Sequence, residues 1–455
     1  MINGYEFSSI KTRKLPHSWQ EEGALAELEK FLQSNWVQRS IFYSDGYVTS
    51  RQQFIDFDRR DGIKLKNYIG TIIFKGEQLN VFPKIFKEDE DDNDTESLYI
   101  DDLINNLVIW LGYCDKLNFP FVSMKGKLSE MESLLELFIT IYIHYVKAAL
   151  DRQGYFQYED ITETGSFIKG KVDFKDYATR KYPMGMSNKL DYTYSSFEFD
   201  NSVNRIIKST CNILNVLTKQ RANKDILRRL LMRLGDVSTV SCVPSDCDKI
   251  HLSTLHSNYR IILSMSKMFL LNKVNTYNMG RTEAFCFLFP AEILFEEFVG
   301  GFIKDMFRDT ANVSTQTRDQ HLAELVVDGE MLGKAFQLRE DMLIEMDDKV
   351  VVLDTKYKEI DRFEKIKDNR KLGISDSDIK QMAIYGVKRG AKKLYLLFPL
   401  YRNEPPEVIN ITYNLILEES NSKIPLQVLK IPFVFARDVE ETKAIIKSIL
   451  AVIET

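Results

Sequence analysis

The chain has 455 residues, of which 44% are hydrophobic and 28% charged, a composition typical of a soluble globular protein with two or three domains. Its net charge of −5 excludes a protein that binds nucleic acid through an overall basic surplus, so such a role would need a local basic face or a partner. The sequence has no run of 18 apolar residues and no basic-then-apolar N-terminus, which argues against membrane spanning and export.

Residues 1–97 are predicted to be a β-rich N-terminal region. Alternating apolar residues in 63–74 and 79–82 flank a short polar turn, a pattern typical of a β-hairpin. Partner docking is assigned to residues 68–86, because Phe82 and Pro83 end an apolar strand that we expect to be exposed. Seven acids among the nine residues 88–96 predict a solvated linker, with DNA mimicry or docking on a basic partner as the alternative.

Residues 98–280 are predicted to be mainly helical, with short strands. Apolar residues recur at helical spacing up to about residue 149, and strand-like pieces punctuated by glycines occupy 154–177. Further helices are expected at 201–217, 224–234 and 253–271.

Residues 281–455 are predicted to form a compact α/β domain. Pro290 stands where the first turn of a helix tolerates proline. The elements expected after it are a β-hairpin at 342–353, a helix at 377–388, and strands at 393–399 and 408–413. We assign no role to residues 1–60 or 405–455.

The hairpin at 342–353 carries the most informative residues. If Asp347 and Asp348 are its turn, Met346 pairs with Lys349 and Asp341 then lies opposite Asp354. Opposed side chains on one face of a sheet lie about 4.5–5.5 Å apart. Lys356, two residues after Asp354, projects from the same face. Two carboxylates and an ammonium are therefore expected at the open end of the hairpin.

This combination predicts metal-dependent phosphodiester chemistry. Two carboxylates so close repel each other, and a divalent cation such as Mg²⁺ removes the repulsion. The cation would polarise a phosphate and activate water, while Lys356 orients that water or neutralises developing charge. The alternative is a surface hairpin with ordinary ion pairs, because Asp-x-Lys alone is common. Asp341, Asp354 and Lys356 are the predicted catalytic residues, the two acids being metal ligands.

Further residues are expected to support this site. On the helix after Pro290, Glu296 or Glu297 could reach the metal. Glu296 is predicted as the third catalytic and metal-binding acid, against the alternative of a solvated acid. Gln381 and Tyr385 share one helix face and could contact DNA or steady Lys356, although a buried tyrosine beside an amide is the alternative. Lys358 is assigned to DNA binding.

A local excess of positive charge accompanies the predicted site. Residues 356–393 contain 12 Lys and Arg against 6 Asp and Glu, although the whole chain is acidic. Such a stretch fits a phosphodiester backbone, and a solvated helix face is the alternative.

The five cysteines are odd in number and scattered, as expected for buried thiols in the cytoplasm. Cys242, Cys247 and His251 could belong to a zinc site, but a fourth ligand at suitable spacing is missing, and a loop flanking a helix is the favoured interpretation.

Together these residues resemble a known family. Asp341, Asp354-Thr355-Lys356 and Gln381-x-x-x-Tyr385 resemble the PD-(D/E)xK nuclease fold, and the chain from about 60 to 400 resembles the McrC family of McrBC modification-dependent restriction systems. The stretches outside the nuclease motif that carry this likeness are Tyr68-Ile-Gly, Val81-Phe-Pro-Lys-Ile, Lys169-Gly-Lys-Val-Asp-Phe, Glu198-Phe-Asp-Asn-Ser-Val-Asn-Arg and Leu294-Phe-Glu. One departure is Glu340, which stands where a proline is expected before the first acid; it puts the local backbone in doubt, not the chemistry.

The resemblance implies an α+β multidomain fold: a β-rich N-terminal domain, a mostly helical middle region and a C-terminal PD-(D/E)xK nuclease domain. It implies a Mg²⁺-dependent endonuclease that cuts methylcytosine-containing double-stranded DNA and stimulates an AAA+ GTPase ring of the McrB type. GTP would bind that partner, because this sequence has no Gly-x-x-x-x-Gly-Lys-Ser/Thr phosphate loop. The alternatives are a non-cleaving, DNA-gripping activator of the ring and a stand-alone repair nuclease of the same fold.

Overall fold

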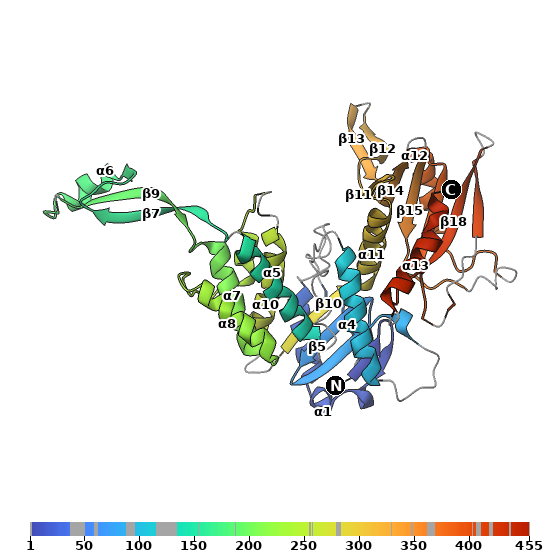
Figure 1. Cartoon of the computed structure of the whole chain (residues 1–455), viewed down its shortest axis with the longest axis horizontal. Helices are drawn as coiled ribbons and strands as arrows, with labels where there is room; N and C mark the ends of the chain where they lie inside the picture. Colours follow the sequence, from blue (N-terminus) through green and yellow to red (C-terminus); the bar gives the residue numbers. More distant parts are fainter. Residues whose placement is uncertain are drawn as a thin grey trace. The chain divides into compact units, whose positions relative to one another are not determined.

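The computed structural model describes residues 2–36, 51–58, 62–87, 96–114, 134–152, 154–186, 188–253, 256, 258–278, 284–328, 330–346, 349–361, 369–402, 404–405, 411–417, 422–435 and 438–454. The chain forms two compact units (Figure 1). The first unit contains residues 1–132 and 283–455, and the second contains residues 133–282. In the described ranges, no helix is long and apolar enough to cross a membrane.

The first unit begins with a four-stranded sheet in the order β1 (Ile2–Tyr5), β6 (Glu77–Phe82), β5 (Tyr68–Phe74) and β10 (Ala284–Pro290). The expected hairpin is confirmed, with Phe74 opposite Glu77. β10 comes from far along the chain and pairs antiparallel with β5. Gly70 permits this pairing, because a Cβ there would lie 2.2 Å from the Phe287 carbonyl oxygen.

A smaller sheet and two helices complete the N-terminal part. They are β2 (Ser9–Lys11), β4 (Gly62–Leu65), β3 (Ile55–Asp58), α1 (His17–Gln20) and α2 (Ala24–Asn35). The expectation of an exposed apolar strand here is wrong, since Phe82 and Tyr68 are only 2% and 4% exposed. β5 and β6 lie between β1 and β10, and the rings of Trp19 and Phe31 pack on Phe74, so the strands are core rather than docking surface.

Two helices join the N-terminal part to the C-terminal part of the first unit. α4 (Glu96–Tyr113) packs on α11 (Ala291–Met306) so closely that a Cβ on Gly301 would lie 1.8 Å from the Tyr113 carbonyl oxygen. Trp110 stacks on Phe433 with ring centroids 4.1 Å apart, and its indole N–H donates to the Phe433 carbonyl at 2.7 Å. The N-terminal β-region therefore shares a core with the C-terminal residues.

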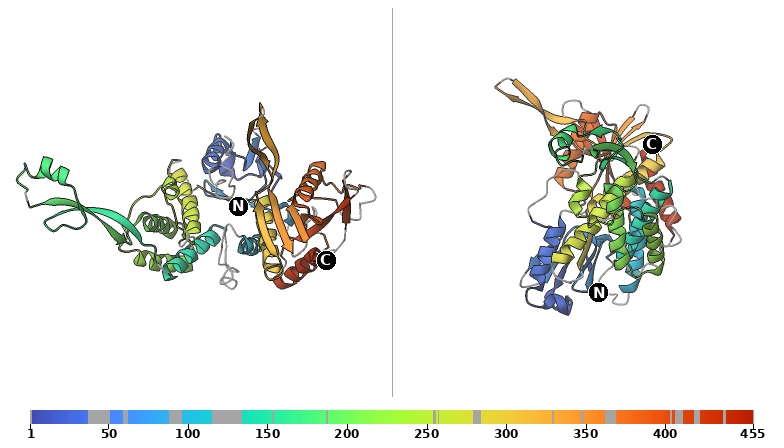
Figure 2. Two further views of the ribbon diagram at one scale, coloured as in Figure 1. Left: turned by 90° about the horizontal axis from the view of Figure 1, so that it is seen from above. Right: turned by 90° about the vertical axis from the view of Figure 1, so that its left-hand side faces the viewer.

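The C-terminal part is built on a six-stranded mixed sheet (Figure 2). The strand order is β11 (Asn312–Thr317), β14 (Glu340–Met346), β15 (Lys349–Thr355), β16 (Lys393–Leu400), β18 (Ser422–Pro432) and β17 (Ile411–Leu417). β15, β16 and β18 run parallel, whereas β14 and β17 are antiparallel to their neighbours. β17 overlaps the strand predicted at 408–413, whereas β18 was not predicted.

Helices pack on both faces of this sheet. α12 (Asp376–Arg389) connects β15 to β16, and its Met382 and Tyr385 share an apolar core with Val352 and Leu394. Ser375 caps α12 by accepting the Asp378 N–H, and Gly390 ends it in the left-handed conformation. α13 (Val439–Leu450) packs against β18. α11 contacts β11, β14 and β15.

A two-stranded ribbon, β12 (His321–Val327) and β13 (Glu330–Gln337), extends from the sheet between β11 and β14 (Figure 2). We predicted no strands at 321–337. Its apolar side chains, including Val326, Leu332 and Phe336, are 57%, 63% and 74% exposed, so no hydrophobic core signal distinguishes it.

The second unit is a helical bundle with a long arm. The bundle consists of α5 (Leu134–Arg152), α7 (Ser202–Leu217), α8 (Arg221–Arg233), α9 (Pro244–Asp248) and α10 (Asn258–Asn278). The arm consists of β7 (Gln157–Gly165) and β9 (Leu190–Glu198), which pair along their whole length, with β8 (Lys171–Val172) and α6 (Phe174–Asp176) (Figure 1).

The mixed α/β character and most of the expected helices are confirmed. The two compact units do not coincide with the predicted segments 1–97, 98–280 and 281–455. β10 pairs with β5 and α4 packs on α11, so the first part of the chain and the last belong to one unit. The acidic stretch 88–95 and the turn residues Asp347 and Asp348 lie outside the described residues.

Candidate active site

The hairpin β14–β15 has the register that the sequence predicts. Met346 lies opposite Lys349 and Met342 opposite Leu353, which places Asp341 and Asp354 one position beyond the paired residues. β15 also pairs in parallel with β16, and the Lys356 N–H continues that pairing by donating to the Leu397 carbonyl at 2.9 Å. β16 therefore fixes the backbone that carries Asp354 and Lys356, and β14 fixes β15 up to Leu353.

Asp341 is held across the end of the hairpin by Thr355. The Thr355 backbone N–H and hydroxyl donate to Asp341 Oδ2 at 2.7 and 2.8 Å. One oxygen of this half-buried carboxylate is therefore fixed, and this fixes the direction in which the other oxygen points.

Asp354 and Lys356 form a buried ion pair. The Asp354 carboxyl is 1% exposed, and its Oδ2 lies 2.5 Å from Lys356 Nζ. Burial and then the charge of Asp341 raise the pKa of Asp354 to about 7, against the opposing effect of Lys356. Burial lowers the pKa of Lys356, but the charges of Asp354, Asp341 and Asp378 outweigh it, so that pKa is raised and the lysine stays an ammonium.

Residues of α12 orient this lysine. Lys356 Nζ donates to Gln381 Oε1 at 3.2 Å, and Gln381 Nε2 donates to the Tyr385 hydroxyl at 2.7 Å. That hydroxyl donates to the Arg339 carbonyl at 2.6 Å, beside the start of β14. Gln381 contacts Lys356, as one interpretation expects, and Tyr385 is a buried tyrosine beside an amide, as the alternative expects. Lys358 is engaged by both carboxylate oxygens of Asp378, each at 3.1 Å.

Glu296 lies beside Asp341 rather than next to Asp354. Both acids line a cavity of about 10 Å³, room for about one water molecule, together with Gln316. Gln316 Nε2 donates to Glu296 Oε1 at 2.7 Å, and its own backbone has a left-handed φ of 52°. Among the residues that the structure describes, no three Asp, Glu, His or Cys side chains lie close enough to bind one metal ion together.

Glu340, which replaces the expected proline, anchors β14 to the end of α12. Its carboxylate is fully buried and accepts from Arg389 at 3.1 and 3.0 Å and from the Thr317 hydroxyl at 2.9 Å. Arg389 also pairs with Asp319, and these contacts, with Asp319 contributing first, raise the pKa of the guanidinium. Sequence reasoning missed this network, because nothing in the spacing of residues 340 and 389 indicates contact.

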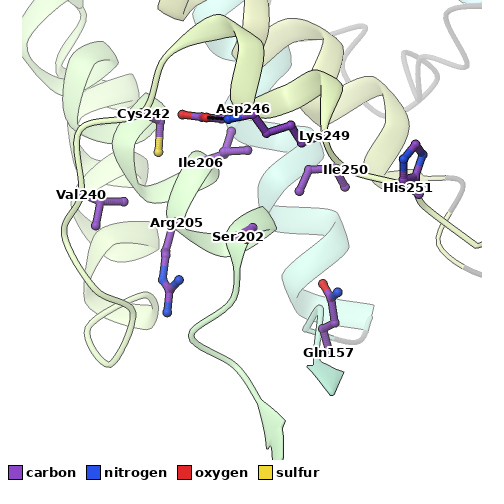
Figure 3. Close-up of a pocket in the computed structure, with 10 residues that line it drawn as sticks. All are labelled: Gln157, Ser202, Arg205, Ile206, Val240, Cys242, Asp246, Lys249, Ile250 and His251. Atoms are coloured by element: carbon purple, nitrogen blue, oxygen red, sulfur yellow. Dashed lines mark hydrogen bonds and ion pairs between the residues drawn. The ribbon is translucent and has the colours of Figure 1, made fainter. Parts of the chain in front are cut away.

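A larger cavity in the second unit lacks the properties of this site. Its volume is about 470 Å³, and Figure 3 shows Arg205, Lys249 and His251 in its lining. Arg205 is paired with Asp200 and Lys249 with Asp246, so these two charges are already balanced. The interpretation of Cys242, Cys247 and His251 as zinc ligands gains no support, because within the described ranges no suitable cluster of ligands occurs.

The carboxylate pair fits a divalent cation. Asp354 is a buried acid whose charged form is disfavoured by burial and by the charge of Asp341. A cation bound by the two acids would offset both effects. Mg²⁺ commonly binds through one or two carboxylates and completes its shell with water and phosphate, so a third protein ligand is not required.

The fold and this cluster define a mixed α/β protein with two carboxylates and a lysine at the end of a β-hairpin. Residues 63–399 match the model of a protein family that is described as McrBC 5-methylcytosine restriction system component. The chain belongs to that family. The matched range includes every candidate site residue named above, from Glu296 to Tyr385.

One solved structure shares this fold along almost the whole chain. A chain of the refined half-complex from a tetradecameric assembly of Thermococcus gammatolerans McrB AAA+ hexamers with bound McrC is 16% identical, with a TM-score of 0.65, over 99% of each chain. A chain of the Thermococcus gammatolerans McrBC complex is 18% identical over 67% of this chain and 88% of that one, with a TM-score of 0.47. No curated protein sequence matches the chain.

Proposed function

We propose that this protein is the Mg²⁺-dependent DNA endonuclease subunit of a McrBC-type restriction complex. The observation that carries the proposal is the convergence of Asp341, Asp354 and Lys356, with the lysine 2.5 Å from the Asp354 carboxylate and held by Gln381. A purely structural role for this arrangement is unfavourable, since it buries a carboxyl beside a second acid.

Asp341 and Asp354 would hold the cation, and Glu296, which lines the small cavity beside Asp341, would reach it through a water molecule. When bound, Mg²⁺ would polarise the scissile phosphate and lower the pKa of a water molecule. Lys356 keeps its proton and presents a fixed positive charge to a phosphate oxygen or to the attacking water. Gln381 limits the movement of the ammonium group, which favours a single reactive geometry.

DNA binding is proposed along the basic stretch 356–393. Its surplus of positive charge lies in sequence directly after the carboxylates, where a phosphodiester would approach. Lys358 contributes less than the sequence suggests, because Asp378 already pairs with its ammonium group. Since the chain as a whole is acidic, we expect DNA affinity to depend on a partner.

That partner is proposed to be an AAA+ GTPase of the McrB type. Membership in the McrBC family supports this, as does the fold shared with a chain from an assembly of McrB hexamers and McrC. We assign the contact surface to the arm of the second unit instead of residues 68–86. Phe167, Phe174 and Tyr158 on the arm are 84%, 68% and 71% exposed, whereas the strands first assigned this role are buried.

The test compares two lysines of the same segment. Lys356→Ala and its control Lys358→Ala are each mixed with the McrB-type GTPase, GTP, Mg²⁺ and methylated plasmid DNA. We expect Lys356→Ala to lose at least about 100-fold in cleavage rate while GTP turnover stays at the wild-type level, and Lys358→Ala to lose only a few-fold. If the wild-type protein stimulates GTP turnover but does not cut the DNA, it is a non-cleaving activator. If it cuts the DNA without the partner, it is a stand-alone nuclease.

A further inference from the structure

A second buried polar cluster lies directly behind the catalytic lysine. Glu6, which follows β1, is 2% exposed, and its Oε1 accepts from the Tyr357 hydroxyl at 2.5 Å and from the Lys84 backbone N–H at 2.9 Å. The Lys84 ammonium group donates to the Tyr357 carbonyl at 3.3 Å and lies 4.8 Å from the centre of the Tyr357 ring. Residues distant in sequence thus enclose one tyrosine.

Tyr357 is adjacent to both flanks of the candidate active site. It follows Lys356 in the chain, at the point where the chain leaves the sheet. Its ring also packs against Phe295 of α11, with centroids 5.8 Å apart, and Phe295 precedes Glu296. Tyr357 is therefore the chain neighbour of Lys356 and packs on the chain neighbour of Glu296.

The cluster is unfavourable for stability alone. Glu6 Oε2 is buried and, within the described part of the chain, has no hydrogen-bond partner. Burial raises the pKa of Glu6 to about 7, even though Tyr357 and Lys84 oppose the shift. The next residue, Phe7, has a left-handed φ of 63°, which a non-glycine residue rarely adopts. Apolar side chains of similar volume would commonly give equal or greater stability in such a place.

We propose that Glu6 and Tyr357 are positioning residues, which hold the backbone after Lys356 so that its ammonium group stays aligned with the Asp354 carboxylate. The inference rests on the proposed nuclease function and extends it. The backbone of Lys356 is fixed on one side by Leu397, and the Glu6–Tyr357 hydrogen bond fixes the chain on the other side. A displacement of about 1 Å in a reacting group can lower a rate by about 100-fold.

The experiment uses the full chain with its GTPase partner, at saturating DNA and Mg²⁺. Tyr357→Phe removes only the hydroxyl that reaches Glu6. The matched control is Tyr395→Phe on β16, the strand beside β15, which removes a hydroxyl that donates to the Val452 carbonyl at 2.9 Å. We expect both variants to lose similar thermal stability. Only Tyr357→Phe should lose activity, about 10- to 100-fold in kcat with KM unchanged.

Two further variants separate positioning from general destabilisation. Glu6→Gln keeps an oxygen that can accept from Tyr357 and should recover most of the rate lost in Glu6→Leu. The double variant Glu6→Leu/Tyr357→Phe should be no slower than the slower single variant, because both changes break the same hydrogen bond.

The inference is overturned if Tyr357→Phe cuts at the wild-type rate, or if Tyr395→Phe loses as much activity. If the wild-type protein cuts normally in the same assay, either result contradicts only the positioning role and leaves the proposed nuclease function standing. Wild-type protein that does not cut under these conditions overturns the proposed function, and the positioning role with it.

Discussion

Replacing Asp354 by Asn should make the metal-free protein more stable at neutral pH. The pKa of Asp354 is raised from 3.8 to about 7, so between these values the folded protein retains a proton that the unfolded chain has lost. Stability therefore falls as pH rises through this window, because the folded state binds more protons. A shift of about three units corresponds to at most about 4 kcal/mol in the free energy of unfolding.

Asn keeps the shape of the side chain but carries no charge to bury. In EDTA, the unfolding free energy of Asp354→Asn relative to wild type should rise from pH 4 to pH 8, by up to about 4 kcal/mol. Urea denaturation at a series of pH values measures this difference. Adding Mg²⁺ at pH 8 should reduce the advantage of the variant, because only the wild type has both carboxylates. Parallel stability curves in EDTA would refute the reasoning.

Three further predictions concern the fold and the partner surface. Gly301→Ala should destabilise the protein by about 1–3 kcal/mol in urea denaturation, because its Cβ would meet the backbone of α4 at 1.8 Å. Arg389→Met should cost about 3–5 kcal/mol by leaving Glu340 buried without its cation, and wild-type stability in this variant would contradict that pairing. Phe167→Ser with Phe174→Ser should leave the melting temperature unchanged and abolish stimulation of GTP hydrolysis; undiminished stimulation would show that the arm is not the contact surface.

The parts of the site that lie close together in sequence could be predicted. A two-residue turn fixes the register of a hairpin, so the placement of Asp341 near Asp354 followed from residue spacing alone. The caps of α12 likewise mark its ends, and the i and i+4 spacing of Gln381 and Tyr385 is seen in their hydrogen bond.

Contacts between distant residues could not be predicted. The sequence of β10 is a short apolar run, and such a run does not indicate that the strand pairs with β5. The same ambiguity produced the wrong expectation that Phe82 is exposed, because an apolar strand does not indicate what covers it. Glu6, Gln316 and Arg389 reach the site from three separate segments, and no local pattern connects them to it.

The central claim is tested most directly by single-turnover cleavage of methylated plasmid DNA by wild type and Asp354→Asn, with the GTPase partner and with GTP turnover recorded in the same reaction. We expect wild type to cut in Mg²⁺ and not in EDTA. Asp354→Asn should be slower by at least about 1000-fold in Mg²⁺ while GTP turnover is unchanged. Cleavage by Asp354→Asn at the wild-type rate would contradict the assignment of the active site to Asp341, Asp354 and Lys356.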